Sequence, residues 1–334
     1  MQVLIVNQNE VNELLSMKEC INVMKQAFRS LANGEAAVHP RNGMRFSKDK
    51  LLGMMPSYLA NIETAGLKVN TVFSENSGTK YHVHQGVVLL FETEHGCLKG
   101  IIDGADITNI RTAAASGLAT SLLANPDAGD LAILGAGTQG SYHLEAMLLV
   151  RKIRRVRIWN PSPERAAKFA QRESLKYGIN IEVMETVKET VKDADLICTT
   201  TPAQEPVLLG EWIPPGAHIN SVGWGGPTAR ELDTNILSRS RLFVDYKNSI
   251  LHDCGDIIIP LHDGTINEDQ ILGIGDILLD KVKGREDRKQ ITLYKSAGVA
   301  IQDLVTAHYI YTQAIKKKMG VFVELGGLNH LEKS

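Results

Sequence analysis

A glycine-rich turn is the segment whose residue types and spacing point most directly to chemistry. Residues 135–140 read GAGTQG and match the pattern G-x-G-x-x-G. An apolar run at 131–134 precedes them, a helix-compatible segment follows, and a second strand-like run at 155–159 ends at the expected distance. The first glycine permits the tight turn, the second lets the backbone approach a pyrophosphate, and the third lets helix and strand pack closely. The turn therefore predicts a dinucleotide whose pyrophosphate sits at the helix N-terminus.

The residues after the second strand-like run indicate which dinucleotide is used. An NAD site usually has an aspartate or glutamate there, which accepts hydrogen bonds from the ribose hydroxyls. This chain has Asn160, Pro161 and Ser162 instead, so no carboxylate would repel a 2′-phosphate. Ser162 could donate to that phosphate and also cap the next helix. Arg165 could reach back as a cation or lie on a solvated helix face. We expect NADPH as the preferred cofactor, with NADH as the alternative.

The elements that must position this turn belong to a region of alternating strands and helices. From residue 130 onward, short apolar runs alternate with amphipathic segments, such as 140–149 and 163–177. Nearly continuous apolar strands in such an alternation are typical of a parallel, doubly wound sheet. We therefore expect an α/β protein with a Rossmann-like dinucleotide-binding domain over 121–304.

The remainder of the chain predicts a second, discontinuous domain. Ser16 and Glu19 form a capping box that starts a helix, and strand-like runs follow it up to residue 103. A last long helix over 297–318 could return to pack on this first part. We expect an α+β domain formed by 1–120 together with 305–334.

The composition describes an ordinary globular protein. The chain has 334 residues, 36 Lys and Arg against 38 Asp and Glu, and a formal net charge of -2. No basic cluster dominates, which argues against nucleic-acid binding. No run of about 18 apolar residues could span a membrane, and the first residues lack the pattern of a secretory leader. The four scattered cysteines fit a reducing compartment, so we expect a cytoplasmic protein.

Further segments around the glycine turn resemble a known family. Residues 110–116 read IRTAAAS, 210–223 read GEWIPPGAHINSVG, 157–160 read RIWN, and 294–303 read YKSAGVAIQD. In this order they resemble the ornithine cyclodeaminase/mu-crystallin family, and within it the mu-crystallin subgroup of ketimine reductases. The resemblance implies a homodimer whose discontinuous domain binds substrate and forms the dimer. It also implies a nicotinamide-dependent reaction on a small α-imino or α-amino acid.

Three cationic residues match the family's substrate-carboxylate positions: Arg41, Lys68 and Arg111. Arginine forms a planar bidentate clamp on a carboxylate, and lysine adds a point charge. Arg45 is a nearby competitor for the place of Arg41. We expect Lys68 also to relay the proton to the imine, because a lysine beside two arginines should have a lowered pKa. Arg41, Lys68 and Arg111 are therefore the expected catalytic residues.

The remaining expected contacts surround the nicotinamide. Gln85 could contact the substrate or the nicotinamide amide, and Trp224 could cap the site or pack against the nicotinamide. Lys295 and Asp303 lie in the segment that, by the resemblance, passes near the nicotinamide, although Asp303 could instead order the last helix. The expected cofactor-binding residues are Thr112, Gly135, Gly137, Thr138, Gln139, Gly140, Asn160, Ser162, Arg165, Thr200, Val222, Gly223 and Lys295.

A pair of histidines is the other group that could do chemistry. His82 and His84 would share one face of a strand. A metal would need a third and a fourth ligand, and the sequence offers no convincing set, so we expect no metal site. A structural or substrate-lining role is the preferred interpretation.

Two departures from the family pattern bear on the reaction. The cyclodeaminases carry an aspartate where this chain has Gly225, and a second carboxylate before a Met-Pro pair, where this chain reads GMMP over 53–56. Cyclodeamination needs a positioned carboxylate for proton transfer. We therefore expect a ketimine reductase, such as a pyrroline- or piperideine-2-carboxylate reductase, or an amino-acid dehydrogenase. A cyclodeaminase-type lyase that recycles NAD and a non-catalytic NADPH-binding protein are the alternatives.

Overall fold

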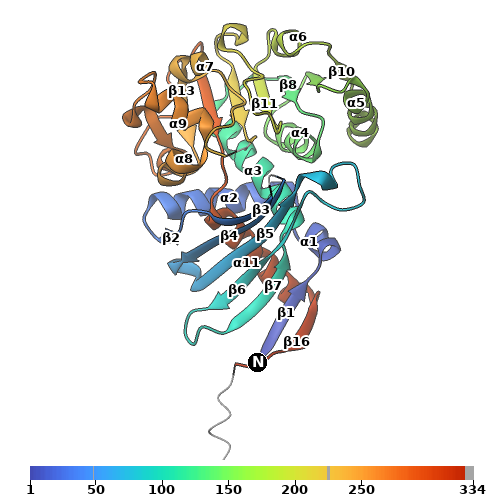
Figure 1. Ribbon diagram of the computed structural model, residues 1–334, viewed down its shortest axis with the longest axis vertical. Helices are drawn as coiled ribbons and strands as arrows, with labels where there is room; N and C mark the ends of the chain where they lie inside the picture. The colour runs from blue at the N-terminus through green and yellow to red at the C-terminus, as the bar shows by residue number, and fades with distance from the viewer. Residues whose placement is uncertain (48, 224–225, 328–334) are drawn as a thin grey trace, which may run out of the picture. The chain divides into compact units, whose positions relative to one another are not determined.

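The computed structural model describes residues 1–47, 49–223 and 226–327. The chain divides into two compact units (Figure 1). We call Met1–Arg111 with Val299–Ser334 the terminal unit, and Thr112–Gly298 the central unit. The boundary lies within helix α3 (Ala105–Leu123). None of the helices in the described part of the chain has the length and apolar character needed to cross a bilayer.

The terminal unit is built on one mixed sheet with the order β16-β1-β7-β6-β5-β4-β2, and β3 pairs with β4. Its strands are β1 (Gln2–Val6), β2 (Ala36–Val38), β3 (Asn42–Ser47), β4 (Lys50–Leu59), β5 (Thr64–Phe73), β6 (His84–Glu92), β7 (Leu98–Asp103) and β16 (Val321–Glu324). Its helices besides α3 are α1 (Gln8–Leu14), α2 (Met17–Ala32) and α11 (Ala300–Lys317), with short 3-10 turns at Ala60–Ile62 and Ser74–Asn76. Helix α2 begins at the predicted capping box, in which Ser16 accepts from the Glu19 N–H.

Helix α11 covers one face of this sheet, and two glycines make the close approach possible. A Cβ atom at Gly66 would lie 2.6 Å from Leu304 Cδ1, and one at Gly100 would lie 3.0 Å from Tyr311 Cδ2. Gly66 belongs to β5 and Gly100 to β7, and Leu304 and Tyr311 belong to α11. The last long helix therefore packs on strands from the first third of the chain, as its sequence predicts.

The central unit is a parallel sheet with the order β10-β9-β8-β11-β12-β15-β13-β14. The strands are β8 (Asp130–Leu134), β9 (Arg155–Trp159), β10 (Ile181–Val183), β11 (Leu196–Thr199), β12 (His218–Ser221), β13 (Ser240–Val244), β14 (Ile271–Gly273) and β15 (Ile291–Lys295). The helices are α4 (Thr138–Val150), α5 (Pro163–Tyr177), α6 (Val187–Val191), α7 (Thr234–Arg239), α8 (Lys247–Asp253), α9 (Gly255–His262) and α10 (Ile274–Leu278). Short 3-10 turns lie at Gly210–Trp212 and Glu268–Gln270.

This order confirms the predicted doubly wound α/β domain. Strand β8 lies between β9 and β11, so the chain direction across the sheet reverses at β8. In open parallel sheets, ligands bind outside the carboxyl ends of the strands at such a switch point. The glycine-rich turn directly follows β8 and therefore lies at this position.

Candidate active site

The glycines of the turn after β8 are required for two different reasons. Gly135 has a φ of 115°, and a Cβ there would lie 2.8 Å from Thr200 Oγ1. A Cβ at Gly140 would lie 2.3 Å from the Gly135 carbonyl oxygen, so packing of α4 on β8 excludes a side chain. A Cβ at Gly137 would meet no described atom within 4 Å. Packing within the protein therefore does not require Gly137, which fits a backbone that must approach a bound group closely.

Helix α4 offers its N-terminus to that group. Gly137 is the N-cap and, among the described side chains, none caps the first turn of α4 by a hydrogen bond. The first N–H groups of such a helix, with the positive end of its dipole, favour a phosphate. Gly137 and Thr138 are exposed, and Gln139 is partly exposed. The residues present thus fit the pyrophosphate of a dinucleotide.

The tip of β9 supports the turn through Asn160. Asn160 Oδ1 accepts from the Ala136 N–H at 3.2 Å, and its Nδ2 donates to the Ser162 carbonyl at 3.2 Å. Ser162 is the N-cap of α5 and accepts from the Arg165 N–H at 3.4 Å. The Arg165 side chain is exposed. Asn160 therefore orders the glycine turn, and the residues at the tip present hydroxyl, amide and guanidinium groups rather than a carboxylate.

The other expected cofactor contacts lie at the ends of β11 and β12. Thr200 Oγ1 donates to the Leu134 and Gly135 carbonyls at 3.1 and 3.2 Å, which ties the end of β11 to the glycine turn. Val222 and Gly223 follow β12 and are partly buried. Thr112 is buried on α3. Trp224, expected at the substrate, and Gly225, the site of the missing aspartate, lie outside the described residues.

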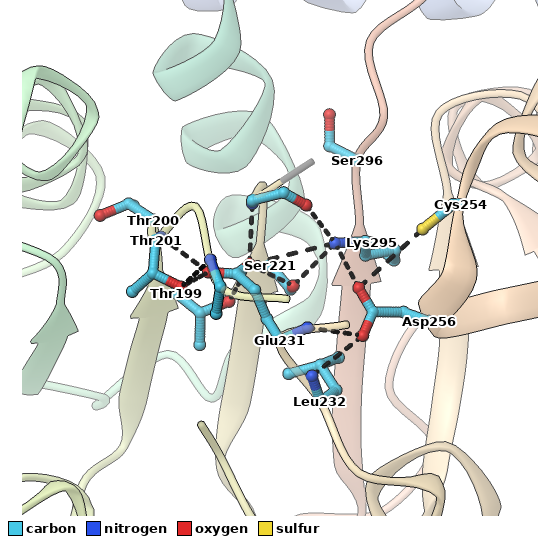
Figure 2. Close-up of polar contacts among 12 residues, drawn as sticks. Thr199, Thr200, Thr201, Ser221, Glu231, Leu232, Cys254, Asp256, Lys295 and Ser296 are labelled. Carbon is cyan, nitrogen blue, oxygen red and sulfur yellow. Dashed lines mark hydrogen bonds and ion pairs between the residues drawn. The ribbon is translucent and has the colours of Figure 1, made fainter. Parts of the chain in front are cut away.

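The Lys295 ammonium contacts protein groups on all sides, unlike the side chain of a direct cofactor ligand. Its side chain is fully buried, and its Nζ donates to the Gly223 carbonyl at 2.8 Å and Ser221 Oγ at 3.1 Å. It also pairs with Asp256 at 2.8 Å (Figure 2). All three ammonium hydrogens therefore have protein acceptors, and Lys295 acts on the segment that begins at Gly223.

In the terminal unit, Lys68 and Arg111 share one carboxylate. Lys68 Nζ lies 2.8 Å from Asp303 Oδ1, and Arg111 Nε lies 3.2 Å from the same oxygen. Lys68 also donates to Thr108 Oγ1 at 2.8 Å, and Arg111 Nη1 donates to Gln302 Oε1 at 3.0 Å. All three charged groups are buried. We call Lys68, Arg111, Gln302 and Asp303 the cationic cluster.

The pKa values of Lys68 and Asp303 are both lowered in this cluster. Burial, with Arg111 and Arg41, lowers the pKa of Lys68 to about 8, although Asp303 opposes this shift. Burial would raise the pKa of Asp303, but Arg111 and Lys68 together lower it below its ordinary value. The expected lowering for Lys68 is present, and burial is its largest cause. The residues opposite Lys68 on the neighbouring strands, Met55 and Val88, are apolar and add to that effect.

Two buried polar atoms of the cationic cluster have no hydrogen-bond partner among the described residues: Gln302 Nε2 and Asp303 Oδ2. Buried polar atoms in proteins are nearly always paired. The cluster therefore retains one donor and one acceptor for a polar ligand, in addition to its positive charge.

The strand register separates Gln85 from His84. Lys68 pairs with Val88, and Val72 pairs with His84, so His84 lies on the same face of the sheet as Lys68. Gln85 pairs with Thr71 and lies on the opposite face. Histidine spacing predicted that His82 and His84 share one face of a strand, but β6 begins at His84 and His82 lies before it, so that prediction is wrong. Only the cross-strand register relates the face of His84 to Lys68.

Two buried carboxylates of the central unit, Glu231 and Asp256, were not among the site residues predicted from the sequence. Glu231 accepts hydrogen bonds from residues at the ends of β11 and β12, and Asp256 pairs with Lys295 (Figure 2). Neither residue belongs to a recognisable spacing pattern, because their partners belong to strand ends and loops that meet only in the folded unit. No local signal could have identified them.

Comparisons with known proteins agree with this geometry. The model of the ornithine cyclodeaminase/mu-crystallin family matches residues 1–318. The ketimine reductase mu-crystallin of Mus musculus is 38% identical over 260 residues, which cover 78% of this chain and 79% of the mouse protein.

Two solved structures are also similar. The Delta(1)-pyrroline-2-carboxylate reductase of Thermococcus litoralis, in complex with NADH and L-proline, superimposes with a TM-score of 0.92 at 38% identity. The match covers 96% of this chain and 99% of that one. An archaeal alanine dehydrogenase dimer with bound NAD superimposes with a TM-score of 0.91 at 31% identity, covering 98% and 100% of the two chains.

Proposed function

Because the chain belongs to the ornithine cyclodeaminase/mu-crystallin family, we propose that it is an NAD(P)H-dependent oxidoreductase of small α-imino acids. It reduces the C=N bond of a ketimine such as Δ1-pyrroline- or Δ1-piperideine-2-carboxylate, or oxidises the CH–NH bond of the corresponding amino acid. The observation that carries this proposal is the buried cationic cluster. Its Gln302 Nε2 and Asp303 Oδ2 atoms have no hydrogen-bond partner among the described residues, and the pKa of its Lys68 is lowered.

The chain's own residues divide the work between binding and proton transfer. Arg111 and Lys68 attract the substrate carboxylate, and Arg41, whose charge acts on Lys68, completes a set of three cations. The Lys68 ammonium holds the proton that the imine nitrogen takes up, and a pKa of about 8 keeps that proton both present and transferable near neutral pH. Asp303 holds Lys68 and Arg111 in one place. When bound, the dinucleotide supplies the hydride to the imine carbon.

A substrate screen tests the reaction. Purified protein is mixed with NADPH or NADH and with Δ1-pyrroline-2-carboxylate, Δ1-piperideine-2-carboxylate, or a 2-oxo acid plus ammonia, and cofactor absorbance is followed. Oxidation of the cofactor with formation of the corresponding cyclic or acyclic amino acid supports the proposal. Release of ammonia from ornithine or lysine without net change in cofactor absorbance would instead identify a lyase.

The proposed cofactor preference is for NADPH. The tip of β9 has Asn160 and Ser162 where an NAD site has a carboxylate, and Arg165 is exposed nearby in the first turn of α5. These groups would neutralise and hydrogen-bond a 2′-phosphate. The test is the ratio of kcat/KM for NADPH and NADH, and a ratio below one would refute the preference.

The proposed assembly is a homodimer formed by the sheet of the terminal unit. On the face opposite α11, several apolar side chains are only partly buried. They include Leu67, Val69, Leu89, Phe91 and Ile101. Partly exposed apolar side chains gathered on one face of a sheet favour an interaction surface. Light scattering after size-exclusion chromatography would give twice the chain mass.

The proposed location is the cytoplasm. All four cysteines are unpaired thiols, and Cys20, Cys198 and Cys254 are buried. Unpaired thiols persist in reducing compartments. Fractionation of source cells, followed by immunodetection, tests the location.

A further inference from the structure

Glu231 is a buried carboxylate between the ends of two neighbouring parallel strands (Figure 2). Its side chain accepts from Thr199 Oγ1 and Thr201 Oγ1 and from the Thr201 N–H, all at the end of β11. It also accepts from Ser221 Oγ and the Gly223 N–H at the end of β12. The five distances are 2.8, 2.7, 2.7, 3.0 and 2.8 Å. One carboxylate thus joins the two strand ends.

The backbone at Gly223 approaches Glu231 so closely that a side chain is excluded. A Cβ at Gly223 would lie 2.2 Å from Glu231 Cδ and 2.3 Å from the Thr201 carbonyl oxygen. The N–H of Gly223 donates to Glu231, and its carbonyl accepts from Lys295. Gly223 is therefore held by a charged group at each of its two backbone polar atoms.

Asp256 completes the network. Its Oδ2 lies 2.8 Å from Lys295 Nζ, and its Oδ1 accepts from the Glu231 and Leu232 N–H groups at 2.9 Å each. Burial alone would lower the pKa of Lys295, but Asp256 and Glu231 raise it above its ordinary value, so the ammonium stays charged. The hydrogen bonds and the ion pair link Glu231, Gly223, Lys295 and Asp256 in a closed circuit.

Stability of the fold does not by itself explain why these charged groups are buried together. Two carboxylates and one ammonium are taken out of water here, and apolar residues of similar volume often stabilise a fold equally well. Its contacts converge on Thr201 and Gly223, next to Thr200 and Val222. In a doubly wound domain, the strands on the two sides of the switch point hold the two mononucleotide halves. Strands β8 and β9 carry the turn and tip expected for the adenosine half, which leaves β11 and β12 for the nicotinamide half.

We propose that Glu231 is a positioning residue that holds the two strand ends against the nicotinamide half of the cofactor, with Lys295 and Asp256 holding the Gly223 carbonyl. This inference rests on the proposed function. Glu231 itself touches no reacting atom. It acts by fixing the backbone of Thr201 and Gly223, so its loss affects nicotinamide placement and leaves the adenosine half unchanged.

The test compares NADPH with 2′-phospho-ADP-ribose, which differs from it only in lacking the nicotinamide ring. Glu231→Gln keeps the side-chain volume but replaces an acceptor with an amide N–H₂ against five donors. We expect NADPH affinity to fall at least about tenfold, the scale of one charge-assisted hydrogen bond, and kcat to fall with it. The affinity for 2′-phospho-ADP-ribose, which lacks nicotinamide, should stay within about twofold. Isothermal calorimetry measures both affinities.

Two further variants make the result interpretable. Glu211→Gln changes an exposed glutamate of the same unit and should leave both affinities unchanged. Thr199→Val removes one of the five donors to Glu231 while keeping the side-chain shape, and should give a smaller effect in the same direction even if the glutamine variant does not fold.

Equal weakening of both ligands, or no weakening of NADPH binding, would overturn the positioning role while the proposed function stands. A wild-type protein that neither binds NADPH nor reduces any ketimine would overturn both.

Discussion

Replacing Asp303 by asparagine should move the pH dependence of ketimine reduction to lower pH. Asp303 is the group that raises the pKa of Lys68, against burial and the charges of Arg111 and Arg41, and the balance is a pKa of about 8. Loss of an opposite charge in direct contact lowers a pKa by about 1–3 units. The descending limb of kcat/KM against pH should therefore move from about pH 8 to about pH 5–7.

The change in rate at a single pH follows from these values. At about pH 7.5, roughly three-quarters of Lys68 is protonated in the wild type and roughly one-quarter or less in Asp303→Asn. The assay is kcat/KM for Δ1-pyrroline-2-carboxylate over a pH series, with cofactor at saturation. Ionisation of the imine itself is common to both proteins and cancels in the ratio of the two profiles. Thr108→Val, which removes a neutral acceptor from Lys68, is the matched control and should move the limb much less.

The Asp303→Asn substitution should also change how the free energy of unfolding depends on pH. Without Asp303, the folded-state pKa of Lys68 lies further below its unfolded value of about 10.4, so the unfolded chain binds a proton that the folded chain releases. The free energy of unfolding of Asp303→Asn should therefore increase as pH rises between those two values, measured by urea denaturation at several pH values. If the limb of kcat/KM stays where it is in the wild type, Lys68 does not carry the transferred proton.

Four further substitutions test the remaining parts of the proposal. Gly140→Ala should lower the melting temperature, because its Cβ meets the Gly135 carbonyl, whereas Gly137→Ala should keep the melting temperature and lose cofactor affinity by calorimetry. Asn160→Asp keeps the acceptor for the Ala136 N–H but adds a charge, so the NADPH-to-NADH ratio of kcat/KM should fall at least about tenfold. Leu67→Glu should convert the dimer to a monomer in light scattering with the fold retained by circular dichroism, and an unchanged mass would contradict the proposed interface.

Features encoded in short stretches of sequence could be predicted well. The capping box at Ser16, the helix after it and the glycine turn after β8 depend on residues within a few positions of one another. Periodicity in the central part predicts the doubly wound sheet, because alternation of apolar strands with amphipathic helices is itself a local property. The family motifs are likewise short runs that can be recognised in order along the chain.

The partners of the buried charges could not be predicted. Asp303 lies 235 positions from Lys68 and 192 from Arg111, and the sequence leaves open whether Asp303 faces a ligand or orders a helix. Glu231 and Asp256 accept hydrogen bonds from main-chain and hydroxyl groups of other segments, and no residue spacing predicts such contacts. Lys295 could be placed near the cofactor by resemblance, but the acceptors that surround its ammonium come from the folded unit.

The sequence by itself determines the fold class and the dinucleotide turn, because each rests on residue type and local spacing, whereas the three cations are singled out by resemblance to the family. Only the tertiary structure decides which charges meet and which face a side chain occupies. Strand side chains alternate with a period of two, so a register difference of one residue would exchange the faces of His84 and Gln85 relative to Lys68. That register is set by packing of whole strands and of α11 on the sheet, which is a property of the folded chain.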